Sequence, residues 1–360
     1  MNSSRIIDWP LFLVALTITT IGLLSVYSAT STVHQPFSLF FKKQLIGAVG
    51  GIIVYFIFAY LDYRALISWG YTGYLGVLIL LLITLVKGRA AMGGRRWLDL
   101  TFIRVQPSEL AKMLLPAFVA HYLTDYYKTT DLVLRTFIPL VLIIGLSFLL
   151  IAKQPDLGTA IVVALSGLIL VWLAQVPHRF FIYFFCIIFL GSPIFWQFLK
   201  PYQKKRVLVF LGASTNAKDS YQLEQSIIAV GSGGLLGKGV CAGTQNKLRF
   251  LPESRTDFIF AVLCEECGFF GALGLLLLYF LMFARIWYLI YWVLHPCAQL
   301  CAIGLALPLV LDMLINIAMV LGLVPLVGIP LPFMSYGMAN LLVNWASLGW
   351  LQAIVSQKTV

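Results

Sequence analysis

The sequence has few charged residues. Asp, Glu, Lys and Arg together make up 11% of its 360 residues, whereas hydrophobic residues make up 61%. A soluble domain usually carries about 25% charged residues, and a chain with so few cannot cover a folded surface that faces water. The composition therefore excludes an ordinary cytosolic enzyme, a disordered chain and a secreted disulfide scaffold, and it predicts an integral membrane protein.

Acidic residues are the scarcer of the two signs. Asp and Glu number 14 and Lys and Arg number 25, which gives a formal net charge of +11 at pH 7. In a membrane protein, such an excess favours anionic lipid head groups or a phosphorylated, lipid-linked substrate as the partner. We expect no nucleic-acid partner.

Paired metal or disulfide ligands are also missing. The four His residues have no ligand spacing, and the six Cys residues are scattered, with one C-x-x-C at Cys264 and Cys267 in an apolar stretch. Because no second pair matches it, zinc or redox chemistry is the weaker interpretation. Small residues that pack between helices are the better one.

Long hydrophobic runs are abundant. A helix needs about 20 apolar residues to cross the hydrocarbon core, and Pro325, Pro330 and Pro332 divide the longest charge-free run. The first run is too long for the apolar core of a signal peptide, so we interpret it as an uncleaved anchor. The pattern predicts an all-α polytopic membrane protein, a single domain over 1–360, with ten transmembrane helices near 9–30, 44–62, 66–86, 109–125, 134–152, 157–175, 179–199, 258–284, 297–324 and 333–355.

The longest segment between spans is 200–257, and the next longest is 87–108. An even number of spans places both termini on one side of the membrane and both of these segments on the other. Lys and Arg are more frequent on the side opposite the termini, but much of this excess lies in 200–257, which the positive-inside rule weighs poorly. Counting charges therefore does not decide the orientation.

Two polar motifs border spans in the first half of the chain. Glu109 and Lys112 are one turn apart and can pair on one helix face. They either brace the helix bundle or line a polar cavity beside a substrate. Segment 153–158 (KQPDLG) separates two spans, and Pro155 and Asp156 suit a turn that starts and caps the next helix.

Two further motifs lie in segment 200–257. Segment 231–239 (GSGGLLGKG) resembles a phosphate-binding loop, but it has Ser232 where that loop needs Gly and Gly239 where it needs Ser or Thr. We interpret it as a flexible turn. Segment 243–257 ends beside a span with the carboxylates Glu253 and Asp257. Thr256 or Asp257 could cap the next helix; alternatively, partial desolvation raises the pKa of a carboxylate and makes it a better base.

The last motif begins with Asp312 and Asn316, one turn apart in a span, and continues in the proline-rich segment 325–336. These polar residues either join helices by hydrogen bonds or belong to a re-entrant segment that lines a cavity. The residue patterns by themselves are compatible with a transporter and with a glycosyl or phosphoryl transferase acting on a membrane-bound anion.

Five motifs, in this order along the chain, resemble the SEDS family of membrane proteins (shape, elongation, division and sporulation). The segments are Arg96-Trp97 with 106–112 (QPSELAK), 154–159 (QPDLGT), 231–237 (GSGGLLG), 251–261 (LPESRTDFIFA) and 325–336. Within the family, segment 243–245 (GTQ) and the short N-terminus resemble the members that act in cell elongation. Three features depart from the family pattern: Arg255 stands where His is usual, Gly94 stands where Ala is common, and 336–339 (YGMA) replaces a Gly-Gly-Ser/Thr-Ser pattern.

The resemblance implies a fold and an activity. It implies ten spans in the bacterial inner membrane with both termini cytoplasmic, so that 200–257 is a large extracytoplasmic loop. It also implies polymerisation of lipid II into glycan strands, in complex with a class B penicillin-binding protein that crosslinks them and alongside the elongation machinery. Asp257 matches the essential loop Asp of the family, and Glu109 and Lys112 match its buried ion pair.

The implied reaction selects the candidate site residues. A β-1,4 bond formed from an α-linked diphosphate requires inversion, hence one displacement with a base for the acceptor hydroxyl and positive charge for the departing diphosphate. We expect Asp257 to be this base. The basic candidates for the diphosphate are Lys43, Arg96, Lys153, Lys205 and Arg249, and the other candidate substrate-binding or cavity residues are Glu109, Lys112, Trp97, Gln154, Glu253, Thr256 and Ser335.

The sequence forms no dedicated metal cage, and a divalent cation such as Mg²⁺ or Mn²⁺ is a candidate for sharing the diphosphate charge. Two rival functions need a similar anion-binding surface. One is a lipid II flippase, which needs no base at Asp257. The other is a scaffold that activates its penicillin-binding partner.

Overall fold

The computed structural model describes residues 7–31, 35–91, 94–100, 103–127, 134–174, 180–182, 186, 190–191, 196–197, 200–213, 217–248 and 250–357. Within these ranges, six helices are long and apolar enough to cross a membrane: α1 (Trp9–Thr30), α2 (Leu39–Tyr60), α4 (Gly70–Lys87), α12 (Ile259–Tyr291), α13 (Pro296–Val320) and α14 (Met338–Ser356). Three more run beside them: α5 (Pro107–Tyr127), α6 (Leu134–Lys153) and α7 (Leu157–Leu173). The chain is therefore a multi-pass membrane protein, and its described residues form helices and one small sheet.

The helices occupy the expected apolar stretches with shifted ends. Helix α2 begins at Leu39, before Lys42 and Lys43, because Ser38 caps it by accepting a hydrogen bond from the Phe41 amide. Helix α12 extends to Tyr291, beyond the expected end at 284. A short helix, α3 (Tyr63–Ser68), precedes α4. Most of the expected span 179–199 lies outside the described residues.

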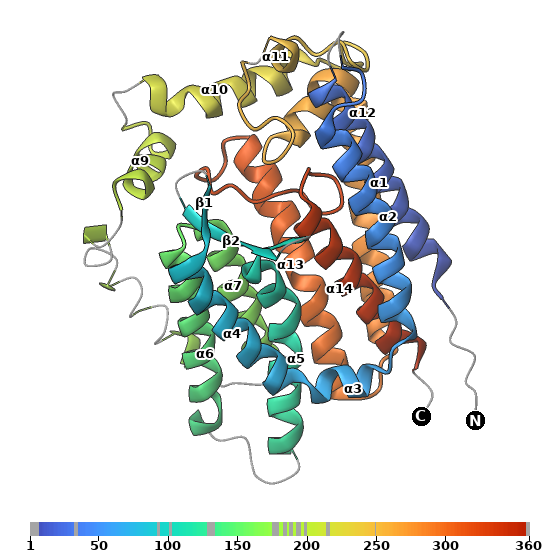
Figure 1. The fold of residues 1–360 in the computed structure, drawn as a ribbon, viewed down its shortest axis with the longest axis vertical. Helices are drawn as coiled ribbons and strands as arrows, with labels where there is room; N and C mark the ends of the chain where they lie inside the picture. The colour runs from blue at the N-terminus through green and yellow to red at the C-terminus, as the bar shows by residue number, and fades with distance from the viewer. Residues whose placement is uncertain are drawn as a thin grey trace.

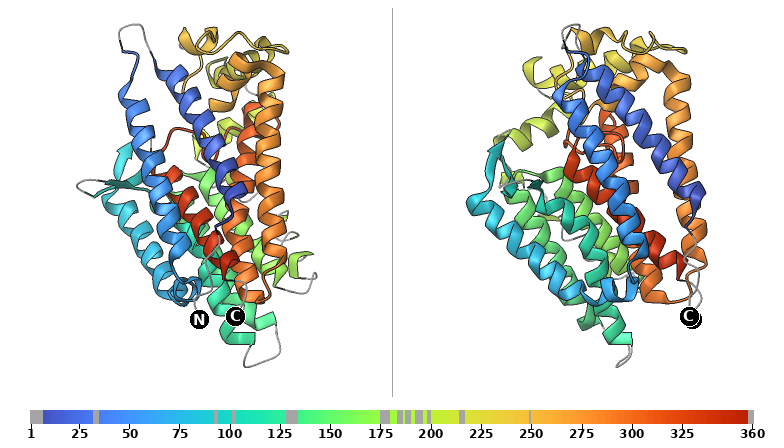
Figure 2. Two further views of the ribbon diagram at one scale, coloured as in Figure 1. Left: turned by 90° about the vertical axis from the view of Figure 1, so that its right-hand side faces the viewer. Right: turned by 45° about the vertical axis from the view of Figure 1, so that its right-hand side comes forward.

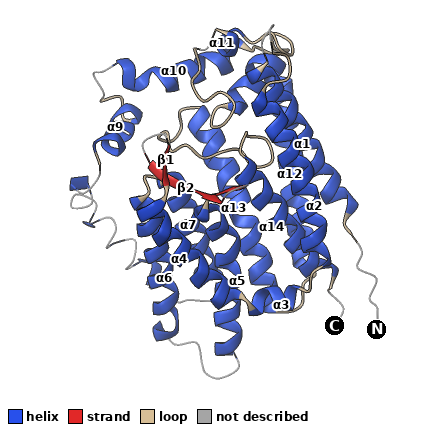
Figure 3. Ribbon diagram, in the orientation of Figure 1, coloured by secondary structure: helices blue, strands red, loops and turns tan. Residues whose placement is uncertain are grey.

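Segment 87–108 contains a sheet that the sequence pattern did not predict. Strands β1 (Arg89–Ala91), β2 (Gly94–Leu100) and β3 (Ile103–Val105) form an antiparallel sheet in the order β1-β2-β3. In their register, Ala91 is paired with Gly94 and Leu100 with Ile103. Figure 3 shows the sheet in red at the end of α4–α7 that faces away from the chain termini.

The two ends of the molecule differ in character. Figure 1 shows the N- and C-termini together at one end, and the short helices α9 (Pro201–Phe210), α10 (Ala217–Ser232) and α11 (Thr244–Lys247) at the other. The expected long loop 200–257 is thus partly helical, and α10 packs against α12.

Among the described residues, two hydrophobic clusters make up the core. One joins α1, α2, α12, α13 and α14 around the buried aromatic rings of Tyr55, Trp345 and Phe333. The other joins α4, α5, α6 and α7 around Tyr74 and Phe137. Figure 2 shows α1, α2, α12 and α14 along one side of the molecule. Helix α13 contacts α5 and α7 as well as α12 and α14, so it connects the two clusters.

The glycine-rich segment 231–239 packs closely on a break in α12. Gly268 has a φ of 66° and interrupts the helix. The amides of Phe269 and Phe270 donate to the carbonyls of Gly234 (2.9 Å) and Leu235 (3.3 Å) rather than to the preceding helical turn. In return, the amides of residues 238 and 239 donate to the carbonyls of residues 265 and 266, each at 3.0 Å. The segment is a turn, as predicted, but it is anchored to a helix.

Candidate functional site

Asp257 lies directly before α12, where three segments meet: the start of α12, the connection 321–337 between α13 and α14, and the turn between α6 and α7. Gly328 faces its carboxylate. The φ of Gly328 is 72°, and a Cβ added there would lie 3.1 Å from Asp257 Oδ2. A glycine is needed at this position because an L side chain would be strained by that φ and would crowd the carboxylate.

The electrostatic surroundings of Asp257 come from several elements. The pKa of its carboxyl is raised from the ordinary 3.8 to about 6, chiefly by burial. The negative charges of Glu253 and Asp156 also raise this pKa, whereas the positive charges of Arg206 and Arg96 lower it. At pH 7, Asp257 is therefore ionised and more basic than an exposed aspartate. A carboxylate in this state can accept a proton from a hydroxyl group.

Arg96 connects the sheet to the turn between α6 and α7. Its guanidinium donates to the carbonyl of Pro155 and, at 3.4 Å, to that of Gln154, and it lies 3.6 Å from the Asp156 carboxylate. A Cβ at Gly94 would lie 2.9 Å from the Gln154 carbonyl oxygen, which is a physical reason for Gly at this position. Arg96 therefore holds this turn while placing positive charge near Asp257.

The turn between α6 and α7 forms where the sequence predicted it, but Asp156 does not cap α7 with its side chain. Its Oδ2 instead accepts from Gln106 Nε2 (3.1 Å) and Ser108 Oγ (3.4 Å). The side chain of Gln154 donates to the Leu81 carbonyl of α4 at 2.9 Å. Helices α4, α5 and α7 are thus tied together beside the candidate site, and Lys153 is exposed.

Thr256 and Asp257 do not cap α12, contrary to one of the two sequence interpretations. The N-cap residue is Phe258, without a side-chain hydrogen bond. The Thr256 hydroxyl donates to the carbonyl (3.2 Å) and the carboxylate (3.1 Å) of Glu253. The guanidinium of Arg255, in place of the usual His, lies over the Phe40 ring with its Cζ 3.9 Å from the ring centroid.

Glu109 and Lys112 form the predicted ion pair, at 2.8 Å, inside the helix bundle. Lys112 Nζ also lies 2.8 Å from Asp312 Oδ2 of α13. Asn340 of α14 donates to Glu109 at 3.0 Å. The pair therefore joins α5, α13 and α14, as the bracing interpretation requires.

The remaining predicted residues are dispersed. Ser335 lies beside Thr256, and Trp97 is half-buried on β2. Lys43 and Lys205 are exposed on α2 and α9, and Arg249 lies outside the described residues. Arg206 was not among the predicted residues, although its positive charge lowers the pKa of Asp257. Its signal in the sequence was the basic run in 204–206.

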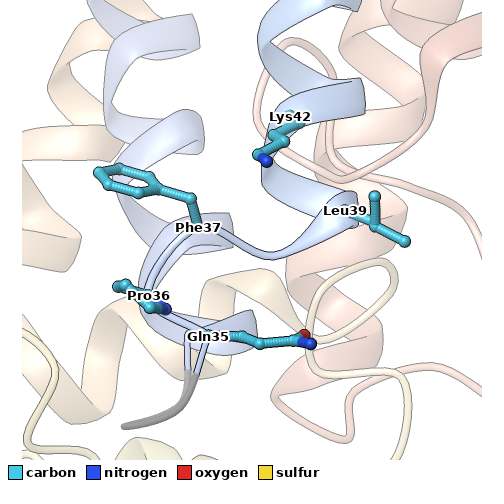
Figure 4. A pocket seen from close by; sticks show the side chains of 5 residues that line it. All are labelled: Gln35, Pro36, Phe37, Leu39 and Lys42. Atoms are coloured by element: carbon cyan, nitrogen blue, oxygen red, sulfur yellow. The ribbon is translucent and has the colours of Figure 1, made fainter.

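Two further features concern metal binding and pockets among the described residues. In the part of the chain that the structure describes, there is no cluster of three or more His, Cys, Asp or Glu that could hold a metal ion. A pocket of about 440 Å³ lies elsewhere, at the junction of α1 and α2, and Gln35, Pro36, Phe37, Leu39 and Lys42 line it (Figure 4). None of these lining residues is among the residues around Asp257.

Comparison with known proteins gives consistent results over the whole chain. The profile of the cell cycle protein family FtsW/RodA/SpoVE matches residues 8–360. Peptidoglycan glycosyltransferase MrdB of Escherichia coli (strain K12) is 38% identical over 351 residues, covering 97% of this chain and 93% of that protein. Stage V sporulation protein E of Bacillus subtilis (strain 168) is 34% identical over 349 residues, covering 95% of each chain.

Solved structures show the same fold. A chain from a peptidoglycan synthase complex that coordinates polymerization and crosslinking superposes with a TM-score of 0.83 at 27% identity, covering 98% of both chains. Rod shape determining protein RodA of Thermus thermophilus gives a TM-score of 0.74 at 25% identity, covering 100% of both chains.

Proposed function

The chain belongs to the cell cycle protein family FtsW/RodA/SpoVE, and from this premise we propose that it is a peptidoglycan glycosyltransferase that polymerises lipid II during cell elongation. The similarity to MrdB, to RodA and to a peptidoglycan synthase complex supports this activity. The observation that carries the chemistry is the carboxylate of Asp257, partly buried, with a pKa of about 6 and with Arg96 and Arg206 close enough to influence it.

Asp257 acts as the general base of an inverting displacement. Its carboxylate takes the proton of the acceptor sugar hydroxyl as that oxygen attacks the anomeric carbon of the donor. The bond from the anomeric carbon to the diphosphate breaks, polyprenyl diphosphate leaves with the electron pair, and the α-linkage becomes a β-1,4 linkage. General-base assistance of this kind contributes roughly 10²–10⁴-fold to the rate.

Positive charge for the leaving diphosphate comes from the sheet and from α9. Arg96 is partly exposed beside Asp257, and Lys205 and Arg206 lie on α9. Guanidinium groups bind diphosphate oxygens in a two-pronged manner, and ammonium groups bind them as point charges. If a divalent cation such as Mg²⁺ or Mn²⁺ takes part, Asp257 would be a residue that holds it, and the cation would offset the charge of the leaving diphosphate.

The same proposal includes three further features: ten transmembrane spans, a cytoplasmic location of both termini, and a class B penicillin-binding protein as partner. The termini lie at the same end of the molecule, opposite α9–α11 (Figure 1), and Asp257 lies between α11 and α12 in the chain. With the termini in the cytoplasm, the site faces the outer side of the inner membrane, where a crosslinking partner has its transpeptidase domain. A reporter that is active only in the cytoplasm, fused to the C-terminus, should therefore be active.

Replacing Asp257 with Asn tests the proposed activity. The wild type and Asp257→Asn are purified with a class B partner whose transpeptidase Ser is mutated, and each is given labelled lipid II in detergent. We expect glycan polymer from the wild type and none from Asp257→Asn. Glu224→Gln, a neutralised exposed carboxylate on α10, is the matched control and should retain activity.

The other outcomes separate the rivals. Polymer from Asp257→Asn would remove Asp257 from the chemistry. An inactive wild type that still binds its partner, in an assay where a known polymerase works, would favour the flippase or the scaffold. Loss of wild-type activity in chelator, restored by Mn²⁺ or Mg²⁺, would favour Asp257 as a metal ligand.

A further inference from the structure

The backbone around Asp257 is held by hydrogen bonds to three successive carbonyl groups. Each carbonyl accepts a hydrogen bond from α13 or from the connection between α13 and α14. The Tyr336 amide donates to the Arg255 carbonyl at 2.9 Å. Ser335 Oγ donates to the Thr256 carbonyl at 2.6 Å, and Asn316 Nδ2 donates to the Asp257 carbonyl at 2.8 Å. We propose that Asn316 and Ser335 are positioning residues that fix the direction of the Asp257 carboxylate; this inference rests on the proposed function.

Both donors are themselves held in place. Asn316 is fully buried on α13, and its amide nitrogen also donates to the Ile329 carbonyl at 2.6 Å. Ser335 is buried, and its hydroxyl accepts from the Leu331 amide at 2.7 Å. Each side chain thus connects the Asp257 segment to segment 325–336, which also brings Gly328 against the carboxylate.

Helix α2 contributes a further side chain that holds the turn containing Ser335. Gln44 is buried and binds both sides of one turn: its Nε2 donates to the Ser335 carbonyl at 3.0 Å, and its Oε1 accepts from the Gly337 amide at 3.2 Å. The turn that carries Ser335 is therefore fixed to a long helix. Gln44 is a third positioning residue, one step further from Asp257.

The Asp257 segment needs such support because no regular structure holds it. It precedes α12, and the N-cap residue Phe258 supplies no side-chain hydrogen bond. A general base must lie within about 2.6–3.2 Å of the oxygen atom whose proton it removes, and a misplacement of about 1 Å can lower the rate by roughly 10²-fold. Three held carbonyls restrict the rotation of the peptide units on which the carboxylate direction depends.

Removing the Ser335 hydroxyl tests the inference. For Ser335→Ala we expect kcat for lipid II polymerisation to fall by about 10- to 100-fold, with KM nearly unchanged because the substrate contacts remain. Ser335→Thr keeps a hydroxyl and should restore part of the activity. Ser147→Ala is the matched control, because it deletes another fully buried serine hydroxyl, bound to Tyr74 at 2.7 Å, on α6.

The pH profile distinguishes positioning from a general loss of structure. The groups that influence the Asp257 carboxyl are Glu253, Asp156, Arg96 and Arg206, and none of them changes in Ser335→Ala. A loosened segment admits water to the carboxylate, so the acid limb of kcat/KM should move to lower pH. A merely unstable enzyme would lose activity equally at every pH.

Each remaining outcome decides between the two proposals. Wild-type kcat and pH profile in Ser335→Ala, or an equal fall in Ser147→Ala, would overturn the positioning role while leaving the polymerase intact. An inactive wild type, or an active Asp257→Asn, would overturn the proposed function itself. If Ser335→Ala does not fold, Gln44→Met takes its place, with a smaller fall in kcat in the same direction expected and an unchanged kcat overturning the inference.

Discussion

At the scale of single residues, the protonation of Asp257 determines when the proposed base can work. Its pKa of about 6 lies above the ordinary value because it is buried, and Glu253 raises that pKa while Arg96 and Arg206 lower it. A base must be deprotonated to accept a proton, so kcat/KM should rise with pH through about 6 and then level. Measuring polymerisation between pH 4.5 and 8 checks this limb.

Glu253→Gln extends the same prediction. Removing the negative charge of Glu253 takes away a contribution that raises the Asp257 pKa, so the acid limb should shift to lower pH. The hydrogen bond from Thr256 can still be accepted by the amide oxygen of Gln. Glu224→Gln, on the exposed face of α10, should leave the limb in place. A limb that moves upward in Glu253→Gln would contradict the electrostatic argument.

The sequence predicts some of this site and not the rest. Asp257 could be proposed because a carboxylate at the border of a span is partly desolvated, and because it matches the resemblance. Arg206 and Asn316 could not be assigned to it, since α9 and α13 approach Asp257 only in the folded chain. Lys43 and Lys153 were selected as diphosphate ligands for the same reason as Arg96, their positive charge. Both are, however, exposed near helix ends.

At the scale of elements, the break in α12 depends on Gly268. Its φ of 66° and ψ of −163° belong to a region essentially restricted to glycine, and an added Cβ would lie 2.3 Å from the Gly237 amide nitrogen. Gly268→Ala should therefore destabilise the protein by at least about 1–3 kcal/mol. Thermal unfolding in detergent measures this loss, and faster tryptic cleavage after the exposed Lys238 and Lys247 reports release of the anchored segment.

Gly274→Ala is the matched control on the same helix. A Cβ at Gly274 would meet nothing within 4 Å, and alanine has the higher helix propensity, so this change should stabilise α12 by about 0.5–1 kcal/mol. Equal effects of the two substitutions would show that the break at Gly268 is not required.

The elements differ in how far the sequence predicts them. Hydropathy locates the long helices because a helix that crosses the membrane pairs its own backbone polar groups and must present apolar side chains to the lipid. Such a helix therefore contains a run of about 20 apolar residues. The sheet in 87–108 escaped this criterion, since its strands are three to seven residues long. The start of α2 was misplaced because Lys42 and Lys43 sit in its first turns, where long side chains reach water from a helix end.

At the scale of the whole molecule, α5, α13 and α14 meet through a buried charge network. Glu109, Lys112 and Asp312 are each 3% exposed or less, and Lys112 Nζ lies 2.8 Å from both carboxylates. Their formal charges are −1, +1 and −1, so the sum is −1. Removing one partner of a buried ion pair is costly because it leaves a charge without compensation.

This charge balance predicts that two substitutions in the network differ strongly. Lys112→Met leaves two carboxylates facing each other with a summed charge of −2, and it should destabilise the protein by about 3–5 kcal/mol. Asp312→Asn keeps an oxygen for Lys112 to donate to and brings the sum to zero, so its cost should stay near 1 kcal/mol. Thermal unfolding in detergent compares them, with Lys87→Met as the control for losing an exposed lysine. Equal losses from Lys112→Met and Asp312→Asn would mean that the lysine does not compensate both carboxylates.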